Sequence, residues 1–239
     1  AAAALVARTG TDLSRLGLRY SHAGIALREG LGSPWAVRQL FYACEASEGR
    51  LFDQGLAGFV LGADDVQTAF VSVLLLPPEA GEPLARATLD RDLALQLLES
   101  RYSANAYAFS TRYQNCNQWV AELLAASLSG TRDRSAAQAW LREAGYAPEP
   151  VRVDSAWVWL AGHFVPHLHF DDHPSEAVAQ RLIQTSLPDR LEAFVLARWP
   201  QAQRLEFCLG PEGVVTREGG APLGAECRAA PGDQLTPGS

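Results

Sequence analysis

The chain of 239 residues contains no methionine, no lysine and no run of basic residues. Its 20 basic residues are therefore all arginines, and 27 acidic residues bring the formal net charge to −7 at pH 7. An acidic chain without a basic patch does not attract nucleic acid or an anionic membrane surface, so neither is an expected partner. We interpret the two missing residue types as the coding bias of a GC-rich genome.

Long apolar runs are also missing, and no stretch approaches the roughly 20 residues that a membrane-spanning helix needs. The longest apolar stretches, near 70–77 and 156–160, have the length of strands. Because the chain begins with four alanines and no methionine, we expect an exported, periplasmic protein whose signal peptide has been removed. The hydrophobic content of 48% predicts one domain over 1–228, with its core at about 8–145 and a disordered tail at 229–239.

Cysteine is scarce, with four residues at positions 44, 116, 208 and 227. Cys208 and Cys227 bracket a short hairpin-like segment, so they would form a local disulfide in an oxidising compartment. That pairing would leave Cys44 and Cys116 as thiols. Four cysteines allow three pairings, and the spacing alone does not choose among them.

The pattern of apolar residues predicts an α+β fold. Strands at 20–27 and 35–44 form a hairpin around a turn at 29–34, after a polar turn at 11–15, and a third strand follows at 67–76. Helices are predicted at 88–99, from Cys116, and from Ser135, which has the capping-box spacing to Gln138. Beyond residue 150 we expect a Trp-rich strand at 151–160, a His-rich loop, helices from about 175 and 187, and two short strands around a turn at 210–213.

Cys116 stands where a polar loop turns into an amphipathic helix. Asn115 is a good N-cap residue, and Gln118 follows at the spacing of a capping box. The unpaired N–H groups and the positive end of the helix dipole at this position favour a thiolate over a thiol. Two interpretations stay open: an activated nucleophile, or a small buried hydrophobic residue that begins a helix.

A cysteine nucleophile needs a base, which is usually histidine. His22 lies in the strand-like apolar stretch Ser21-His-Ala-Gly-Ile25, although it could equally be a core histidine bonded to backbone. The other four histidines lie together in a later loop, at positions 163, 167, 169 and 173.

The segment around His22, together with Asn115-Cys-Asn-Gln-Trp119, resembles the paired motifs of circularly permuted NlpC-type papain-like cysteine hydrolases. In that group the strand that bears the histidine precedes the helix that bears the cysteine, which is the order found here. Four further runs within about 8–140 resemble an exported bacterial family known mainly as a domain of unknown function: Asp12-Leu-Ser14, Leu18-Arg-Tyr20, Asp53-Gln-Gly-Leu56 and Tyr102-Ser-Ala-Asn-Ala-Tyr107.

The resemblance implies a permuted papain-like fold, in which a small antiparallel sheet packs on the helix that bears Cys116, with extra C-terminal helices and a hairpin. It also implies the hydrolysis of an amide or an ester through an acyl-enzyme, without a cofactor. Relatives of the permuted group act on amides or esters, including cell-wall peptides and lipid acyl groups, so the expected partner is a small-molecule substrate or a peptide or lipid substrate of the cell envelope.

The hairpin register brackets the residue that would orient His22. With the turn centred near Gly32, His22 should face position 42, give or take about three residues. One register puts positions 40, 42 and 44 beside His22, and the other puts positions 39, 41, 43 and 45 there. Only the second offers side-chain acceptors, namely the Gln39 amide oxygen and, in reserve, the Glu45 carboxylate. We therefore predict a Cys116–His22–Gln39 triad.

The backbone N–H of Cys116 would be the natural donor to an oxyanion. The side chain of Tyr20, Tyr113 or Asn115 could add a second donor and contact the substrate. Each has a structural alternative, because asparagine commonly caps helices and tyrosine commonly packs with one polar end exposed.

Two other classes of function stay open. A binding module that has lost turnover would lack the orienting residue opposite His22, or would fill its cleft with apolar side chains. A metal-dependent hydrolase would use the histidines of 163–173 with Asp171 and Asp172. Because Pro166 interrupts that run and no convincing His-x-x-x-His helix is present, we predict no metal site.

Overall fold

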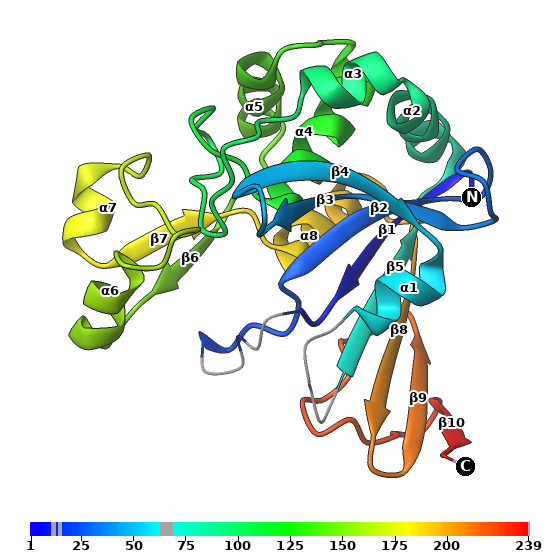
Figure 1. Ribbon diagram of the computed structural model, residues 1–239. Helices are drawn as coiled ribbons and strands as arrows, with labels where there is room; N and C mark the ends of the chain where they lie inside the picture. Colours follow the sequence, from blue (N-terminus) through cyan, green and yellow to red (C-terminus); the bar gives the residue numbers. More distant parts are fainter. Residues whose placement is uncertain (11–12, 14–15, 63–68, 239) are drawn as a thin grey trace.

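The computed structural model describes residues 1–10, 13, 16–62 and 69–238. It is an α+β fold built on one antiparallel sheet of eight strands, in the order β10-β9-β8-β5-β1-β2-β3-β4 (Figure 1). The strands are β1 (Ala3–Arg8), β2 (His22–Leu27), β3 (Ala36–Ala43), β4 (Glu48–Gln54), β5 (Ala69–Leu75), β8 (Gln203–Gly210), β9 (Gly213–Glu218) and β10 (Gln234–Pro237). The expected small sheet is therefore wrong in size, because three C-terminal strands extend it beyond β5.

Strand β1 is central to the sheet, and the sequence pattern did not indicate it. All six of its residues are buried, and it pairs with β2 on one side and β5 on the other. Alanine has a low β-propensity, and a strand buried on both faces shows no alternation of polar and apolar residues. Its last residue, Arg8, pairs directly with His22.

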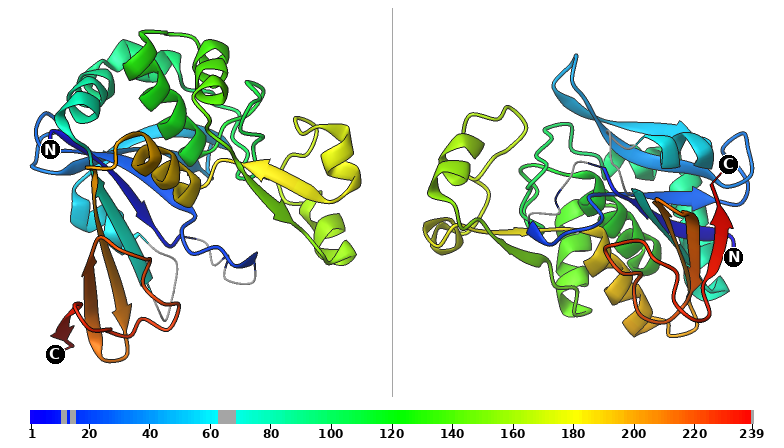
Figure 2. Two further views of the ribbon diagram at one scale, coloured as in Figure 1. Left: turned by 180° about the vertical axis from the view of Figure 1, so that it is seen from behind. Right: turned by 90° about the horizontal axis from the view of Figure 1, so that it is seen from below.

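Helices cover the two faces of the sheet unequally (Figure 2). One face packs against α2 (Pro78–Leu89), α4 (Cys116–Ser129) and α8 (Pro188–Arg198), and Ala23, Ile25 and Leu27 of β2 belong to this main core. The other face carries the short helix α1 (Leu56–Leu61), whose Phe59 packs in a separate cluster with Ala26. Alternate residues of β2 therefore point to opposite sides of the sheet.

Two helix starts differ from their predicted positions because aspartate caps them. The helix predicted at 88–99 is divided into α2 and α3 (Arg91–Gln96), since the Asp90 carboxylate accepts the Leu93 N–H at 2.9 Å. Helix α5 (Arg134–Glu143) begins after Asp133, whose carboxylate accepts the Ala136 N–H at 2.9 Å. The predicted capping box at Ser135 is therefore wrong.

A smaller two-stranded sheet projects from the body as an arm, the yellow-green lobe of Figure 1. It consists of β6 (Glu149–Arg152) and β7 (Leu182–Thr185), with α6 (Ala156–Gly162) and α7 (Ser175–Ala179) beyond them. The strand predicted at 151–160 forms only at 151–152, within β6, because the chain then enters α6, which the Ser155 hydroxyl caps by accepting the Val158 N–H. The helices predicted from about 175 and 187 are present as α7 and α8.

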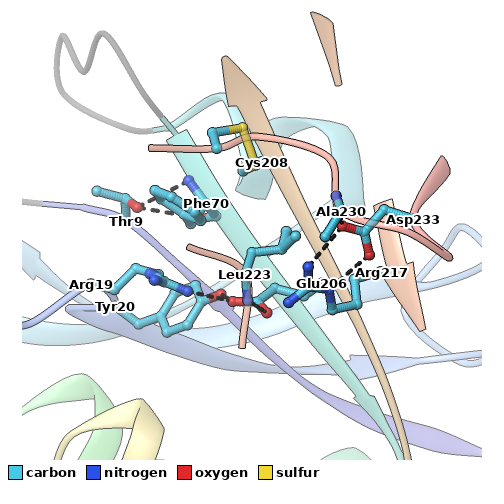
Figure 3. Close-up of a disulfide and its surroundings, with 11 residues drawn as sticks. Thr9, Arg19, Tyr20, Phe70, Glu206, Cys208, Arg217, Leu223, Ala230 and Asp233 are labelled. Carbon is cyan, nitrogen blue, oxygen red and sulfur yellow. Dashed lines mark hydrogen bonds and ion pairs between the residues drawn. A yellow bond between two sulfur atoms is a disulfide. The ribbon is translucent and has the colours of Figure 1, made fainter. Parts of the chain in front are cut away.

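The C-terminal strands are tied down by a disulfide between Cys208 and Cys227, with a Cα–Cα distance of 5.8 Å (Figure 3). Cys44 and Cys116 remain free thiols, as the predicted pairing requires. The expected disordered tail is wrong, because β10 pairs with β9 and the Asp233 carboxylate accepts hydrogen bonds from Arg217 (Figure 3).

Parts of three predicted segments lie outside the residues that the structure describes. Most of the polar turn at 11–15, including Asp12 and Ser14 of the Asp12-Leu-Ser14 run, and the first two residues of the strand at 67–76, lie outside them. Within the described residues, no helix is both long enough and apolar enough to span a membrane.

Candidate functional site

Helix α4 begins at Cys116, and its N-terminus is held by Asn115. The Asn115 side-chain oxygen accepts the Gln118 N–H at 2.8 Å, while its amide group donates to the Thr185 hydroxyl at 2.8 Å. The Gln118 side chain donates to three carbonyls of the preceding loop instead of returning to the cap, so only half of the predicted capping box forms. Asn115 is therefore a helix cap with both polar atoms engaged, and it has no free donor for an oxyanion.

The sulfur of Cys116 lies against the backbone of β2, on both sides of His22. It contacts the carbonyl oxygen of Ser21 at 3.9 Å, and the N–H of Ala23 lies near enough to lower the pKa of the thiol. The ladder between β2 and β3 covers only Ile25–Leu27 on the β2 side, which leaves the Ala23 N–H outside it. The end of the hairpin thus opens at the point where the thiol is inserted.

Burial, not the helix dipole, dominates the electrostatics of this thiol. Cys116 is only 3% exposed, and loss of hydration raises the pKa of its thiol to about 11. The backbone N–H groups of Ala23, Asn117 and Cys116 itself act in the opposite direction and only partly offset the burial. The expected thiolate is therefore wrong for this state, in which Cys116 is a neutral thiol at pH 7.

Gln39 lies beside His22, as the second of the two predicted registers requires. Ile25 of β2 pairs with Arg38 of β3. If this register is continued to the start of β2, His22 lies opposite Phe41. Gln39 is two residues from Phe41 on β3 and therefore points to the same face of the sheet as His22. The Gln39 side-chain oxygen is hydrogen-bonded to Nε2 of His22. Glu45, the reserve candidate, lies in the exposed turn after β3.

Gly24 makes room for this contact. A Cβ atom at position 24 would come within 2.6 Å of a methyl group of Val37 and 3.4 Å of the Gln39 Cβ. The glycine of the His-Ala-Gly-Ile segment thus lets β3 approach β2 closely enough for the Gln39 side chain to reach His22.

His22 is held as a neutral imidazole with a defined tautomer. An amide oxygen only accepts hydrogen bonds, so Nε2 carries the proton and Nδ1 keeps its lone pair. Burial first, and the positive charge of the neighbouring Arg8 second, lower the pKa of His22 to about 4, against the opposing bond from Gln39. Nδ1 is also the ring nitrogen nearer to the residue's own backbone, and the Cys116 sulfur lies against the backbone of the residues on either side of His22.

The thiol and the imidazole are neighbours without a direct bond. Within the described residues, the hydrogen bonds of Cys116 and of His22 go to other partners and not to each other. The His22 ring packs 5.7 Å from the ring of Phe59, on the α1 face, whereas the sulfur approaches from the α4 face. Proton transfer needs the two atoms within hydrogen-bond reach, and such contacts are often longer before substrate binds.

Tyr102 is a site residue that the sequence reasoning did not assign. Its backbone is bridged to Gln114, two residues before Cys116, and its hydroxyl lies near enough to the Cys116 thiol for the thiol to raise the pKa of the hydroxyl. Burial first, and then the proximity of Cys116, raise the pKa of Tyr102 well above its usual value, so the hydroxyl remains a donor. The only sequence signal was its place in the loop that leads to the cysteine.

Asn117 is a second residue that was missed, and it positions the start of β2. Its side-chain amide donates to the carbonyl of Ser21 at 3.2 Å and to the carbonyl of Ser186 at 3.1 Å. The side-chain oxygen accepts from the Cys116 thiol at 3.5 Å. Asn117 therefore connects α4, the residue before His22 and the entry to α8.

The two tyrosines predicted to contact the substrate have structural contacts elsewhere. Tyr20 is buried among the C-terminal strands, and its hydroxyl donates to Glu206 at 2.5 Å (Figure 3). Tyr113 stacks on His169 with ring centroids 4.4 Å apart, and its hydroxyl donates to Asp171 at 3.4 Å. Both hydroxyls are engaged by carboxylates, and contact of the two tyrosines with a substrate stays a prediction.

The four histidines of the 163–173 loop are held by separate partners. His163 and His173 bond to the carbonyls of Trp159 and Asn105, and His167 packs against Tyr42. Among the described residues, no group of three His, Cys, Asp or Glu side chains is arranged to hold a metal ion. The described residues therefore offer no set of ligands for a metal-dependent hydrolase.

The fold and the site define an α+β protein in which a buried helix-N-terminal cysteine lies beside a histidine–glutamine pair. A family model described as "uncharacterized protein conserved in bacteria" (DUF2145) matches residues 1–195. The chain belongs to this family, and the match contains every residue of the candidate site. No curated protein and no solved structure matches the chain.

Proposed function

We propose that the chain is a cysteine-dependent hydrolase of the circularly permuted papain-like, NlpC type, which cleaves an amide or ester bond. The observation that supports it best is the bond between Gln39 and Nε2 of His22. That bond orients the ring and leaves Nδ1 unprotonated, while the Cys116 sulfur lies against the backbone of the residues on either side of His22. A base held by a third group beside a cysteine is the arrangement of a nucleophilic triad.

In the proposed reaction, Nδ1 of His22 takes the thiol proton while the Cys116 sulfur attacks the carbonyl carbon of the substrate. The Gln39 oxygen stabilises the resulting imidazolium through Nε2–H. The oxyanion accepts hydrogen bonds from the Cys116 N–H and the Tyr102 hydroxyl. The tetrahedral intermediate expels an amine or alcohol, which receives the proton from His22, and water then hydrolyses the thioester with His22 as base.

The pKa values favour general-base catalysis over a preformed ion pair. With the thiol pKa at about 11 and the His22 pKa at about 4, both groups are neutral at pH 7 before substrate binds. The thiol is also only 3% exposed. Tyr102 and the loop that carries it must therefore move before a substrate can reach the sulfur.

A papain-like binding module without turnover is the second candidate. The closed thiol and the absence of a Cys116–His22 bond among the described residues favour it. The presence of Gln39 beside His22 favours the hydrolase, because a module that has lost turnover has no use for a base oriented in this way.

We propose further that the protein works in the periplasm, on a peptide or lipid substrate of the cell envelope. The Cys208–Cys227 disulfide supports an oxidising compartment. Fractionation of the native bacterium, followed by mass analysis with and without reductant, tests this: the chain should be periplasmic and lack two thiol hydrogens. A reduced, cytosolic chain would contradict it.

Burst kinetics with p-nitrophenyl acetate test the activity. The Cys44→Ser protein should release about one equivalent of nitrophenol rapidly and then turn over slowly. Cys116→Ser in the same background should abolish the burst, and His22→Asn should slow it by about 10²- to 10⁴-fold. A burst that survives both substitutions would exclude the hydrolase, and binding of cell-wall fragments without any burst would identify a binding module.

A further inference from the structure

The end of the arm carries a cluster of exposed apolar side chains, here called the apolar tip: Trp157, Val158, Leu160 and Phe164. Trp157 and Phe164 are each 81% exposed, and Val158 and Leu160 are more than half exposed. They lie on α6 and in the turn after it, far from the main sheet (Figures 1 and 2). Scattered surface apolar residues are ordinary, but two large aromatic side chains exposed together are not.

The apolar tip is exposed because α6 is held by its other side. Trp159 and His163 pack on the ring of Phe170, with centroids 4.6 Å and 4.4 Å away, and Ser155 caps the helix. A Cβ atom at Gly162 would come within 3.3 Å of the Phe170 ring, so this contact is already close. The anchored face leaves the four tip residues directed away from the protein.

Charge is missing from this segment. Residues 155–170 contain no Arg, Asp or Glu, in a chain that is 20% charged and carries a net charge of −7. Insertion of the tip into an apolar medium would thus desolvate no ionised arginine or carboxylate, which is the largest cost of burial. The acidic remainder gives no attraction to anionic lipid, so a neutral surface complements it better.

The exposed area suits a bilayer better than a second copy of the chain. Four side chains with these exposures offer on the order of 500 Å², whereas a stable protein interface needs about 800 Å² from each partner. A fluid bilayer requires no matching surface, and tryptophan favours the boundary between headgroups and acyl chains. We propose that the apolar tip docks the protein on zwitterionic lipid bilayers by inserting Trp157 and Phe164 into this boundary.

The arm also connects the apolar tip to the candidate active site. The loop after the tip contacts the loop that precedes Cys116, because the His167 carbonyl accepts the Ala104 N–H at 2.9 Å. The His167 ring also packs on Tyr42. Tyr42 in turn packs on Tyr102, whose hydroxyl lies near the Cys116 thiol. Docking would hold the Cys116 region near the lipid surface, but it does not depend on the proposed hydrolysis.

Sedimentation of the full chain with phosphatidylcholine vesicles tests the docking. The wild-type chain should bind, with little change between low and high salt, and the double variant Trp157→Ser, Phe164→Ser should bind about 10- to 100-fold more weakly. Leu61→Ser is the matched control, because Leu61 is also 81% exposed but lies on α1, and it should leave binding unchanged. Circular dichroism establishes that each variant is folded.

A second variant separates insertion from loss of structure. Vesicles should shift the tryptophan emission of the wild-type chain to shorter wavelength, and Trp157→Phe should lose most of this shift while retaining binding. The proposal is overturned if the wild-type chain does not sediment with phosphatidylcholine, or if it binds only phosphatidylglycerol and salt releases it. It is equally overturned if the double variant binds like wild type, or if the tip substitutions only convert a dimer into a monomer. Turnover of p-nitrophenyl acetate in solution is independent of all these outcomes.

Discussion

The side-chain oxygen of Gln39 accepts a hydrogen bond from Nε2 of His22, and this one contact determines which ring nitrogen is free to act as a base. Gln39 comes from β3 and His22 from β2, so the contact depends on the hairpin register. Because Gly24 lies opposite Gln39 and a Cβ there would clash with Val37, the contact also depends on a residue without a side chain.

Substitution of Gln39 should change the rate and its pH dependence in different ways. Gln39→Ala leaves Nε2–H unpaired and the ring free to rotate, so acyl transfer should fall about 10- to 100-fold. Gln39→Glu places a carboxylate beside the ring, which favours the imidazolium and should move the acidic limb of the pH–rate profile to higher pH. Gln54→Glu, the same change on β4, is the control. Unchanged limbs in Gln39→Glu would remove Gln39 from the triad.

Glu122 should be essential for stability, because it is a fully buried carboxylate beneath the loop that leads to Cys116. It accepts bonds from Arg134 at 2.8 and 3.1 Å, from Gln114 at 2.6 Å and from Gln138 at 2.6 Å. Glu122→Gln removes the closest countercharge of the buried guanidinium and leaves only Glu99, 4.0 Å away, so the free energy of unfolding should fall by about 3–5 kcal/mol. Urea unfolding measures it.

The exposed pair Glu82–Arg86, at 4.0 Å, provides the control for this loss. Glu82→Gln should change the free energy of unfolding by less than about 0.5 kcal/mol, because water screens exposed charges. A similar small effect for Glu122→Gln would show that the buried network is not needed to hold α4 and α5 together.

The pH dependence of stability should contain two opposing contributions. Burial first, with the charges of Asp189 and Glu206, raises the pKa of Glu192 to about 7, so the folded chain binds this proton more tightly than the unfolded chain. That stability is complete below about pH 4.5 and is lost as pH rises through 7. His22, with its pKa lowered to about 4, contributes stability above 6.5 that is lost as pH falls through 4.

Glu192→Gln should separate the two contributions. The variant lacks the titrating carboxyl, so its stability relative to wild type should increase by about 3 kcal/mol between pH 4.5 and pH 8. Urea midpoints at several pH values measure this difference. Glu143→Gln, at an exposed position of α5, is the control, and a difference that stays constant with pH would contradict the assigned pKa of Glu192.

Alkylation should distinguish the two free cysteines before any substrate is present. Iodoacetamide reacts with thiolates, and the buried Cys116 thiol has its pKa raised to about 11, whereas Cys44 is exposed. Cys44 should therefore be labelled faster at pH 7, and labelling of Cys116 should still be increasing at pH 10. Mass analysis of peptides measures both rates in one sample. A Cys116 rate that reaches its plateau below pH 8 would contradict the neutral thiol.

Sequence reasoning was strongest where local chemistry decides the structure. The start of the helix at Cys116, the Asn115 cap, the hairpin around position 32 and the contact of Gln39 with His22 all follow from turn residues, capping and the period of two along strands. The pairing of Cys208 with Cys227 likewise agrees with their bracketing of a short hairpin.

Long-range packing explains what was missed. The neutral state of Cys116 results from burial against the β2 backbone, which outweighs a helix dipole that the sequence does reveal. Asn117 joins the site through a bond to the Ser21 carbonyl, 96 positions away, and Tyr102 through the folding of the loop before Cys116. The bond of Tyr20 to Glu206 was missed because the two residues are 186 positions apart.

The most direct test of the Cys116–His22–Gln39 triad is to find which cysteine carries the acyl group after brief exposure of the wild-type chain to p-nitrophenyl acetate at pH 7. The exposed Cys44 is an internal competitor, and its acylation needs no base from the protein. We predict that the thioester forms mainly on Cys116, and that His22→Asn reduces it by at least about 100-fold without changing Cys44. Acylation confined to Cys44, or acylation of Cys116 that is the same without His22, would contradict the triad.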